Sequence, residues 1–266
     1  MKKKELKLLP VLGKGLLFFI KTPYYLGKGI YNLTKNNSER IKKNKVRKKR
    51  ESIPPKYEEF QVVDIMQGNY SSWMESVAKS DSKIGIILGA RGTGKTAFGI
   101  KFLENIHSKY NRRCFAIGFS EDDLPSWISS VSGTSELENN SFVLIDEGGI
   151  LFNSRSSMSN ANKLLSELIM IARHKNISIL FISQNSSNLE VNILRQADFL
   201  ILKPSSLLQK EFERKIIQKI YRETEEHFKK HGDKPGITHV YSSNFRGFIT
   251  NPLPSFWGEK ISKGFR

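Results

Sequence analysis

The chain has 266 residues, of which 38% are hydrophobic and 26% are charged, which suffices for one large domain with an appendage and excludes a globally disordered protein. The formal net charge of +17 indicates an anionic partner, either nucleic acid or a lipid surface. The single Cys114 excludes an internal disulfide and a multi-cysteine metal site, and it fits a reducing, intracellular compartment. No apolar run reaches the roughly 18 residues of a membrane span, so we expect a cytoplasmic protein without a transmembrane helix.

Basic residues are concentrated at the start of the chain. Residues 1–50 hold 16 Lys and Arg against Glu5 and Glu39, a net charge of +14, which leaves +3 for the other 216 residues. Lysines recur every seven residues from Lys7, and the apolar residues between them keep the 3-and-4 spacing of a helix face. The pattern predicts a basic amphipathic helical arm over residues 1–55, divided into two short helices at Pro23.

The surface on which this arm lies is left open by the sequence. A basic amphipathic segment is typical of an anchor at an anionic membrane surface, and the alternative is a helix packed on the main domain. The arm could also dock on capsid or virion proteins, or its polar residues 38–51 could contact DNA phosphates. In the membrane and capsid cases the protein would be peripheral to a membrane or associated with a virion.

A glycine-rich loop lies between a predicted strand and a predicted helix, at residues 83–88 and 97–106. The loop reads Gly-Ala-Arg-Gly-Thr-Gly-Lys-Thr, the Walker A pattern whose backbone N–H groups curl around the β-phosphate of a nucleotide. In that pattern Lys95 reaches the β- and γ-phosphate oxygens, and the Thr96 hydroxyl ligates Mg²⁺. The predicted ATP-binding residues are Gly89, Ala90, Arg91, Gly92, Thr93, Gly94, Lys95, Thr96 and Ala97.

A second apolar strand carries two carboxylates at its end. Residues 141–147 hold four consecutive apolar residues followed by Asp146 and Glu147, the form of a buried parallel strand whose carboxyl end points into a ligand crevice. Downstream of a Walker A loop, this is a Walker B strand. We expect Asp146 to hold Mg²⁺ through its water shell and Glu147 to polarise the attacking water as general base.

The remaining apolar segments complete a sheet. Residues 177–182 predict a strand that ends beside Gln184, whose side chain would sense the γ-phosphate or, alternatively, bond a loop backbone. Further strands are expected at residues 114–119 and 198–203, and helices at residues 159–174 and 207–230. The second helix is expected to bury Phe212, Ile216, Ile220 and Phe228. Five strands alternating with helices predict an α/β fold with a doubly wound, mainly parallel sheet.

These patterns divide the chain into three parts. The basic arm spans residues 1–55, and the expected ATPase core spans residues 56–236. Residues 237–266 are aromatic and proline-containing, which indicates a packed extension or a partner-docking segment.

The order of these features resembles the FtsK/HerA branch of the P-loop ATPases, with a RecA/FtsK-like fold. Within that branch it is similar to genome-packaging ATPases of archaeal and other membrane-containing viruses and to the zonular occludens toxin-like (Zot) assembly ATPases of filamentous phage. The resemblance covers residues 80–230 and rests on residues 89–96, 142–147, 171–174 and 179–184. It implies a homo-oligomer such as a hexamer, a sensor role for Gln184, and an arginine supplied by a neighbouring subunit. The candidates for that arginine are Arg155, Arg173 and Arg195, of which we favour Arg173.

The leading functional hypothesis is an oligomeric ATPase that hydrolyses ATP to move double-stranded DNA, as in viral genome packaging. The first alternative is a Zot-like, membrane-associated ATPase for virion assembly or extrusion. The second is a nucleotide-binding regulatory or structural protein with slow turnover, because a motif does not set a rate. The candidate catalytic residues are Lys95, Glu147, Gln184 and Arg173, with ATP and Mg²⁺ as cofactors.

Overall fold

The structure is a computed structural model that describes residues 48, 50–51, 53–80, 82–154 and 158–258. The chain divides into two compact units, Met1–Lys49 and Arg50–Arg266, and all elements named below belong to the second. Residues 1–47, 49 and 52 of the arm predicted over residues 1–55 lie outside the described residues, as does the candidate Arg155.

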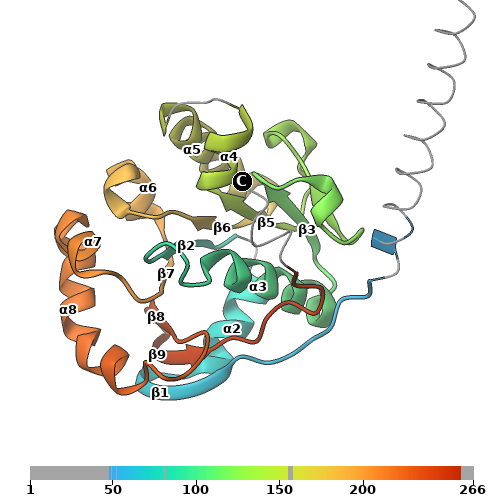
Figure 1. The fold of residues 1–266 in the computed structure, drawn as a ribbon. Helices are drawn as coiled ribbons and strands as arrows, with labels where there is room; N and C mark the ends of the chain where they lie inside the picture. The colour runs from blue at the N-terminus through green and yellow to red at the C-terminus, as the bar shows by residue number, and fades with distance from the viewer. Residues whose placement is uncertain (1–47, 49, 52, 81, 155–157, 259–266) are drawn as a thin grey trace, which may run out of the picture. The chain divides into compact units, whose positions relative to one another are not determined.

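Within the described residues a nine-stranded sheet runs in the order β1-β9-β8-β7-β2-β6-β5-β3-β4 (Figure 1). The six strands from β7 to β4 are parallel, and β8, β9 and β1 continue the sheet antiparallel at the β7 edge. The strands are β1 (Gln61–Gly68), β2 (Ile84–Leu88), β3 (Arg113–Ile117), β4 (Ile128–Ser130), β5 (Ser141–Asp146), β6 (Ser178–Ile182), β7 (Phe199–Leu202), β8 (Thr238–Ser242) and β9 (Phe245–Thr250). The predicted α/β class with a mainly parallel sheet is confirmed, and β1, β4, β8 and β9 add to the five strands expected.

Helices cover both faces of this sheet. One face carries α2 (Tyr70–Lys79) and α3 (Lys95–Tyr110), and the other carries α5 (Met158–Lys175), α6 (Val191–Gln196) and α8 (Lys215–Lys230). The remaining helical elements are α4 (Glu147–Ser154), α7 (Leu207–Phe212) and the 3₁₀ turns η2 (Glu121–Asp123), η3 (Thr134–Glu136) and η4 (Ser186–Asn188). Because both faces are covered, the central strands β2, β5 and β6 are buried along their whole length, as their continuous apolar sequences require.

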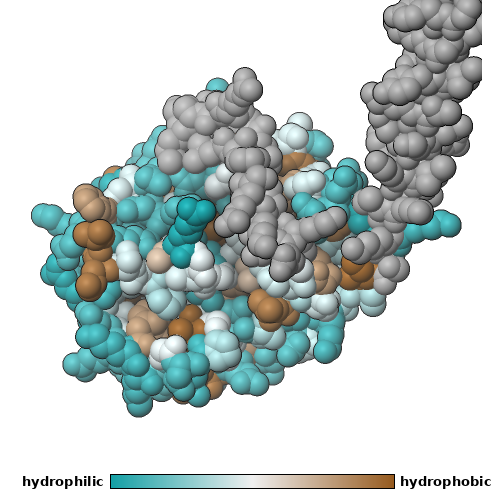
Figure 2. All heavy atoms as spheres, in the orientation of Figure 1, coloured by the Kyte–Doolittle hydropathy of each residue, from teal (hydrophilic) through white to brown (hydrophobic). Residues whose placement is uncertain are grey.

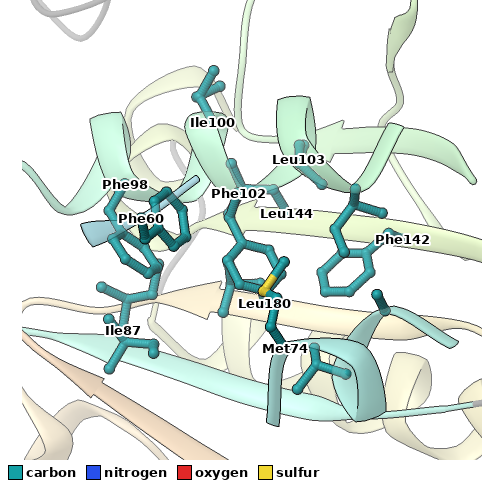
Figure 3. Close-up of a cluster of buried hydrophobic side chains, with 14 of the residues drawn as sticks. Phe60, Met74, Ile87, Phe98, Ile100, Phe102, Leu103, Phe142, Leu144 and Leu180 are labelled. Atoms are coloured by element: carbon teal, nitrogen blue, oxygen red, sulfur yellow. The ribbon is translucent and has the colours of Figure 1, made fainter. Parts of the chain in front are cut away.

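The core consists of one apolar layer on each side of the sheet, because successive strand residues point to opposite faces. On β2, Ile87 packs toward α2 and α3, whereas Ile86 and Leu88 pack toward α5 and α8. Figure 3 shows Phe98 and Phe102 of α3 pointing into the first layer, with the Phe60 and Phe98 rings 5.1 Å apart. This packing fixes the helix that begins directly after the glycine-rich loop.

The prediction of one long helix over residues 207–230 is wrong, because the chain breaks between α7 and α8. Glu213 and Arg214 are extended there, and tertiary hydrogen bonds hold them: Ser186 N donates to Glu213 Oε2 at 2.7 Å, and Arg214 N donates to Ser186 Oγ at 2.9 Å. The break also changes which side is buried. Phe212 and Ile216 are 69% and 56% exposed, and the buried residues of α8 are Ile217, Ile220, Tyr221 and Thr224.

The described part of the C-terminal segment, residues 237–258, contributes β8 and β9 to the sheet. β8 pairs with β7, and β9 pairs with β8 and with β1, so this segment joins the parallel core to the first strand. Among the described residues no helix is long and apolar enough to cross a membrane.

Candidate nucleotide-binding site

The sequence motifs converge where parallel strands end. β7, β2, β6 and β5 are consecutive neighbours in the sheet, so their carboxyl ends lie side by side. The residues that follow these ends are Lys203, Gly89, Ser183 and Glu147 respectively. In open parallel sheets the crevice beyond the strand ends is where ligands bind.

The loop of residues 89–96 requires its glycines for two different reasons. Gly92 and Gly94 have φ values of +81° and +83°, a conformation that L side chains rarely adopt, and nothing lies within 4 Å of a Cβ built at either position. Gly89 also has a positive φ, +147°, and in addition makes a close approach, since a Cβ there would lie 2.5 Å from Cβ of Lys203. Ala90 N donates to the Pro204 backbone oxygen at 3.0 Å, which ties the loop to the end of β7.

Lys95 is held inside this loop by the loop's own backbone. Its Nζ donates to the backbone oxygens of Gly89 and Ala90, at 2.7 and 2.9 Å, and the residue is 8% exposed. Burial lowers the pKa of the Lys95 ammonium, and the charges of Asp146 and Glu147 oppose that shift. A phosphate would offer the ammonium anionic oxygens in place of neutral carbonyls, so the arrangement suits the role predicted for Lys95.

Thr96 and Asp146 face each other across the strand ends. Thr96 Oγ1 donates to Asp146 Oδ2 at 3.0 Å, and Gly148 N donates to Asp146 Oδ1 at 3.0 Å. Asp146 is 6% exposed, and burial raises the pKa of its carboxyl. A hydroxyl and a carboxylate in contact are hard oxygen donors of the kind that Mg²⁺ takes together with waters and phosphate oxygens, so these residues fit that ion.

Glu147 lies beside this pair at the start of α4 and is 4% exposed. Its Oε1 accepts a long hydrogen bond of 3.5 Å from Asn188 Nδ2, and Oε2 has no hydrogen-bond partner within the described part of the chain. Burial raises the pKa of this carboxyl, polar contacts with Ser183, the Gln184 backbone and Asn188 oppose the rise, and the charge of Asp146 adds to it. A carboxylate with a raised pKa and an unpaired oxygen is suited to accept a proton from water.

The other predicted catalytic residues that the structure describes have exposed side chains. Gln184 follows β6, and its side chain is exposed. Its backbone N–H acts on the Glu147 carboxyl, and its backbone oxygen accepts from Gln209 Nε2. Arg173 and Arg195 are exposed near the ends of α5 and α6, which lead into the amino ends of β6 and β7. Both arginines therefore lie toward the amino ends of the parallel strands, whereas the loop lies at their carboxyl ends. Neither arginine lies close to Lys95 of its own chain.

Three polar residues at the site were missed by the sequence analysis. Asn188 contacts Glu147, and the buried Glu213 accepts from the N–H of Ser186 beside it. Lys203 is fully buried under Gly89. The signal for Lys203 was a lysine directly after an apolar strand, whereas nothing in the sequence marks Asn188 or Glu213 apart from their polarity.

The fold and the loop together form a phosphate-loop arrangement, in which a glycine-rich loop joins a buried parallel strand to a helix. No protein-family model and no curated protein sequence matches the chain.

Among solved structures, the chain is similar to the genome packaging NTPase B204 of Sulfolobus turreted icosahedral virus 2 in complex with sulfate, with 16% identity, a TM-score of 0.46, and coverage of 65% of this chain and 98% of that one. The DNA-packaging ATPase B204 of Sulfolobus Turreted Icosahedral Virus gives 17% identity and a TM-score of 0.44 at the same coverage. EssC (ATPases 2 and 3) of Geobacillus thermodenitrificans gives 11% identity and a TM-score of 0.42, covering 80% of this chain and 49% of that one.

Proposed function

We propose that this protein is an ATPase that works as an oligomeric motor on double-stranded DNA. The observation that carries the proposal is the joint placement of Lys95, Thr96, Asp146 and Glu147 at adjacent strand ends.

The loop and the two acidic residues support ATP hydrolysis. Lys95 and the loop N–H groups would bind the phosphates, and Thr96 and Asp146 would hold Mg²⁺, which neutralises charge on the β- and γ-phosphate oxygens. Glu147 would accept the proton of the attacking water. Its unpaired Oε2 and raised pKa are the properties that this role needs.

Two features of the surface support association of this chain with further copies of itself. Arg173 is exposed and far from the loop of its own chain, so in this proposal it completes the site of a neighbouring copy. In addition, α7 and the start of α8 present an apolar surface formed by Leu207, Leu208, Phe212 and Ile216, each between 56% and 79% exposed. Figure 2 shows apolar side chains gathered over this part of the molecule. Contiguous exposed apolar residues of this kind mark interaction sites.

The proposal that DNA is the substrate rests on the family resemblance of the motifs and on the charge of the arm. The net charge of +14 over residues 1–50 suits contact with phosphates, and such contact weakens as salt rises. The same arm supports the second candidate, a membrane-associated assembly ATPase of the Zot kind, because a basic amphipathic segment also binds anionic lipid.

The test measures ATP hydrolysis with and without duplex DNA for the full chain, alongside its mass in solution. We expect hydrolysis that duplex DNA stimulates, and Lys95→Ala and Glu147→Gln should each lose about 100-fold or more of it. Glu147→Gln should still bind ATP, and the exposed replacements Lys219→Ala and Glu211→Gln serve as matched controls.

A different measurement tests each part of the proposal: the role of Glu147, the action on DNA, and the docking of the arm. Loss of ATP binding in Glu147→Gln would contradict the assignment of this residue as base, and hydrolysis indifferent to duplex DNA would contradict the motor. Deleting residues 1–50 should abolish salt-sensitive binding to DNA or to anionic vesicles, and the vesicle arm of this measurement identifies the Zot-like alternative. Unchanged binding to both after the deletion would refute a docking role for the arm.

A further inference from the structure

Three potential metal ligands meet far from the nucleotide loop, on the face of the antiparallel edge that α8 covers. Asp64 lies on β1, and His227 and His231 lie four residues apart near the end of α8. His227 Nδ1 and His231 Nε2 are 2.9 and 3.3 Å from Asp64 Oδ2, and the three ligand atoms all lie within 4.8 Å of one another. Within the described residues no other group of three or more His, Cys, Asp or Glu side chains meets in this way.

We propose that Asp64, His227 and His231 form a binding site for Zn²⁺. Imidazole nitrogens and a carboxylate oxygen are ligands that zinc prefers, and a site with three protein ligands leaves a fourth position for water. Histidines at i and i+4 lie on the same face of a helix, so both rings can reach one ion.

The distances agree with tetrahedral coordination. Zinc bonds of about 2.0–2.1 Å to nitrogen and oxygen place neighbouring ligand atoms roughly 3.3 Å apart. The separation of His231 Nε2 from Asp64 Oδ2 already has this value, and that of His227 Nδ1 is shorter by a few tenths of an ångström. The ligand nitrogens of the two histidines lie within 4.8 Å of each other, so side-chain movements that bring them closer would complete the coordination.

Packing around Phe248 fixes the rings. Phe248 pairs with Asp64 on one side and with His239 on the other, so the three side chains form a row across β1, β9 and β8. The His227 ring stacks on Phe248 at 5.4 Å with an interplanar angle of 13°. Ring positions set by stacking leave the imidazole nitrogens available to a metal.

The same row contains a second polar group that the fold leaves unexplained. His239 is 1% exposed, and neither of its ring nitrogens has a hydrogen-bond partner among the residues that the structure describes. Its ring centroid lies 4.9 Å from that of Phe248. Burial lowers the pKa of His239 to about 3, so this ring adds no positive charge near the proposed ion.

Charge and access favour zinc over magnesium here. The side chains of Asp64, His227 and His231 are 26%, 34% and 11% exposed, so an ion can reach them from solvent. The site has a single carboxylate, Asp64, on which the cationic Lys230 acts, and this is too little negative charge for a hard oxygen-seeking ion. Nitrogen ligands suit zinc.

The experiment titrates ZnCl₂ into the chelator-treated full chain by calorimetry, with excess Mg²⁺ present to occupy the oxygen ligands of the nucleotide site. We expect one equivalent of zinc to bind, and His227→Gln with His231→Gln should weaken binding by more than about 100-fold. His174→Gln, at an exposed histidine of α5, is the matched control and should bind as the wild type does.

Two further measurements distinguish the loss of zinc ligands from misfolding of the variant. Asp64→Asn retains a hydrogen-bonding side chain of the same size, and it should also lose zinc while its circular dichroism stays that of the wild type. Co²⁺ bound to the wild-type protein should give the intense visible absorption of a tetrahedral site. No zinc binding by the wild-type protein, binding unchanged in the double variant, or a cobalt spectrum without tetrahedral bands would each overturn the proposal. These outcomes do not depend on ATP hydrolysis.

Discussion

Lys203 provides a test of how the C-terminal strands support the nucleotide loop. It is 0% exposed at the end of β7, and its Nζ donates to the Gly236 backbone oxygen at 2.9 Å and to Asn251 Oδ1 at 2.7 Å. Both acceptors are neutral. Burial lowers the pKa of this ammonium from 10.5 to about 7. A neutral amine has two N–H donors, which matches the two acceptors, and we propose Lys203→Met as the perturbation.

The pH dependence follows from the two pKa values. Below pH 7 the lysine is charged in both the folded and the unfolded chain, so it does not make the free energy of unfolding depend on pH. Between pH 7 and 10.5 the folded chain releases the proton and the unfolded chain keeps it, so the free energy of unfolding rises with pH. One pKa unit corresponds to about 1.4 kcal/mol, which gives a rise of about 2.5 kcal/mol between pH 6 and pH 9. Lys203→Met removes this rise.

The assay is equilibrium urea unfolding of the wild type and of Lys203→Met at pH 6, 7, 8 and 9. The stability advantage of the wild type should be about 2.5 kcal/mol larger at pH 9 than at pH 6, since all other titrating groups cancel in the difference. Lys101→Met is the control. Lys101 is also 0% exposed, but it pairs with Glu104 at 2.8 Å, so its loss should cost about 3–5 kcal/mol by leaving that carboxylate without its cation. A difference between the wild type and Lys203→Met that stays constant with pH would refute the reasoning.

Two further predictions concern the backbone near Asp146 and the apolar surface of α7. Gly118→Ala should lower the free energy of unfolding by about 1–3 kcal/mol, because φ is +91° and the new Cβ would lie 2.5 Å from the Asp146 backbone oxygen. Gly133→Ala, where nothing lies within 4 Å, is the control, and equal effects in urea unfolding would contradict the argument. Phe212→Ser should shift sedimentation toward the monomer while leaving urea unfolding of the monomer within about 0.5 kcal/mol, and an unchanged mass would exclude this surface from self-association.

The parts of the fold that could be predicted are those that the chain encodes locally. The loop of residues 89–96 and the carboxylates of Asp146 and Glu147 are marked by residue type and order, and their strands by continuous apolar runs. The break between α7 and α8 was not predictable in the same way, because the helix periodicity continues through Glu213. The break is caused by hydrogen bonds that join Glu213 and Arg214 to Ser186, which lies outside the segment whose periodicity predicts the helix.

The antiparallel edge of the sheet, formed by β8, β9 and β1, was even less predictable from the sequence than this break. Asp64 and His227 are 163 positions apart, and only the pairing of β1 with β9 and the position of α8 bring them together. The register irregularities in β1 add to this, since an alternating pattern no longer tells which side chains share a face. Long-range pairing of this kind depends on the whole sheet, so the zinc site that we propose has no signature in the sequence beyond two histidines four residues apart.

The C-terminal strands connect these two regions of the protein. Asn251 and Gly236 accept from Lys203, Lys203 packs directly beneath Gly89, and Tyr221 of α8 donates its hydroxyl to the Lys203 backbone oxygen at 3.1 Å. The first residue of the phosphate loop therefore rests on a lysine whose partners come from the start and end of the β8–β9 segment and from α8. The β8–β9 segment, which the sequence analysis placed outside the expected core of residues 56–236, therefore supports the start of the glycine-rich loop together with α8.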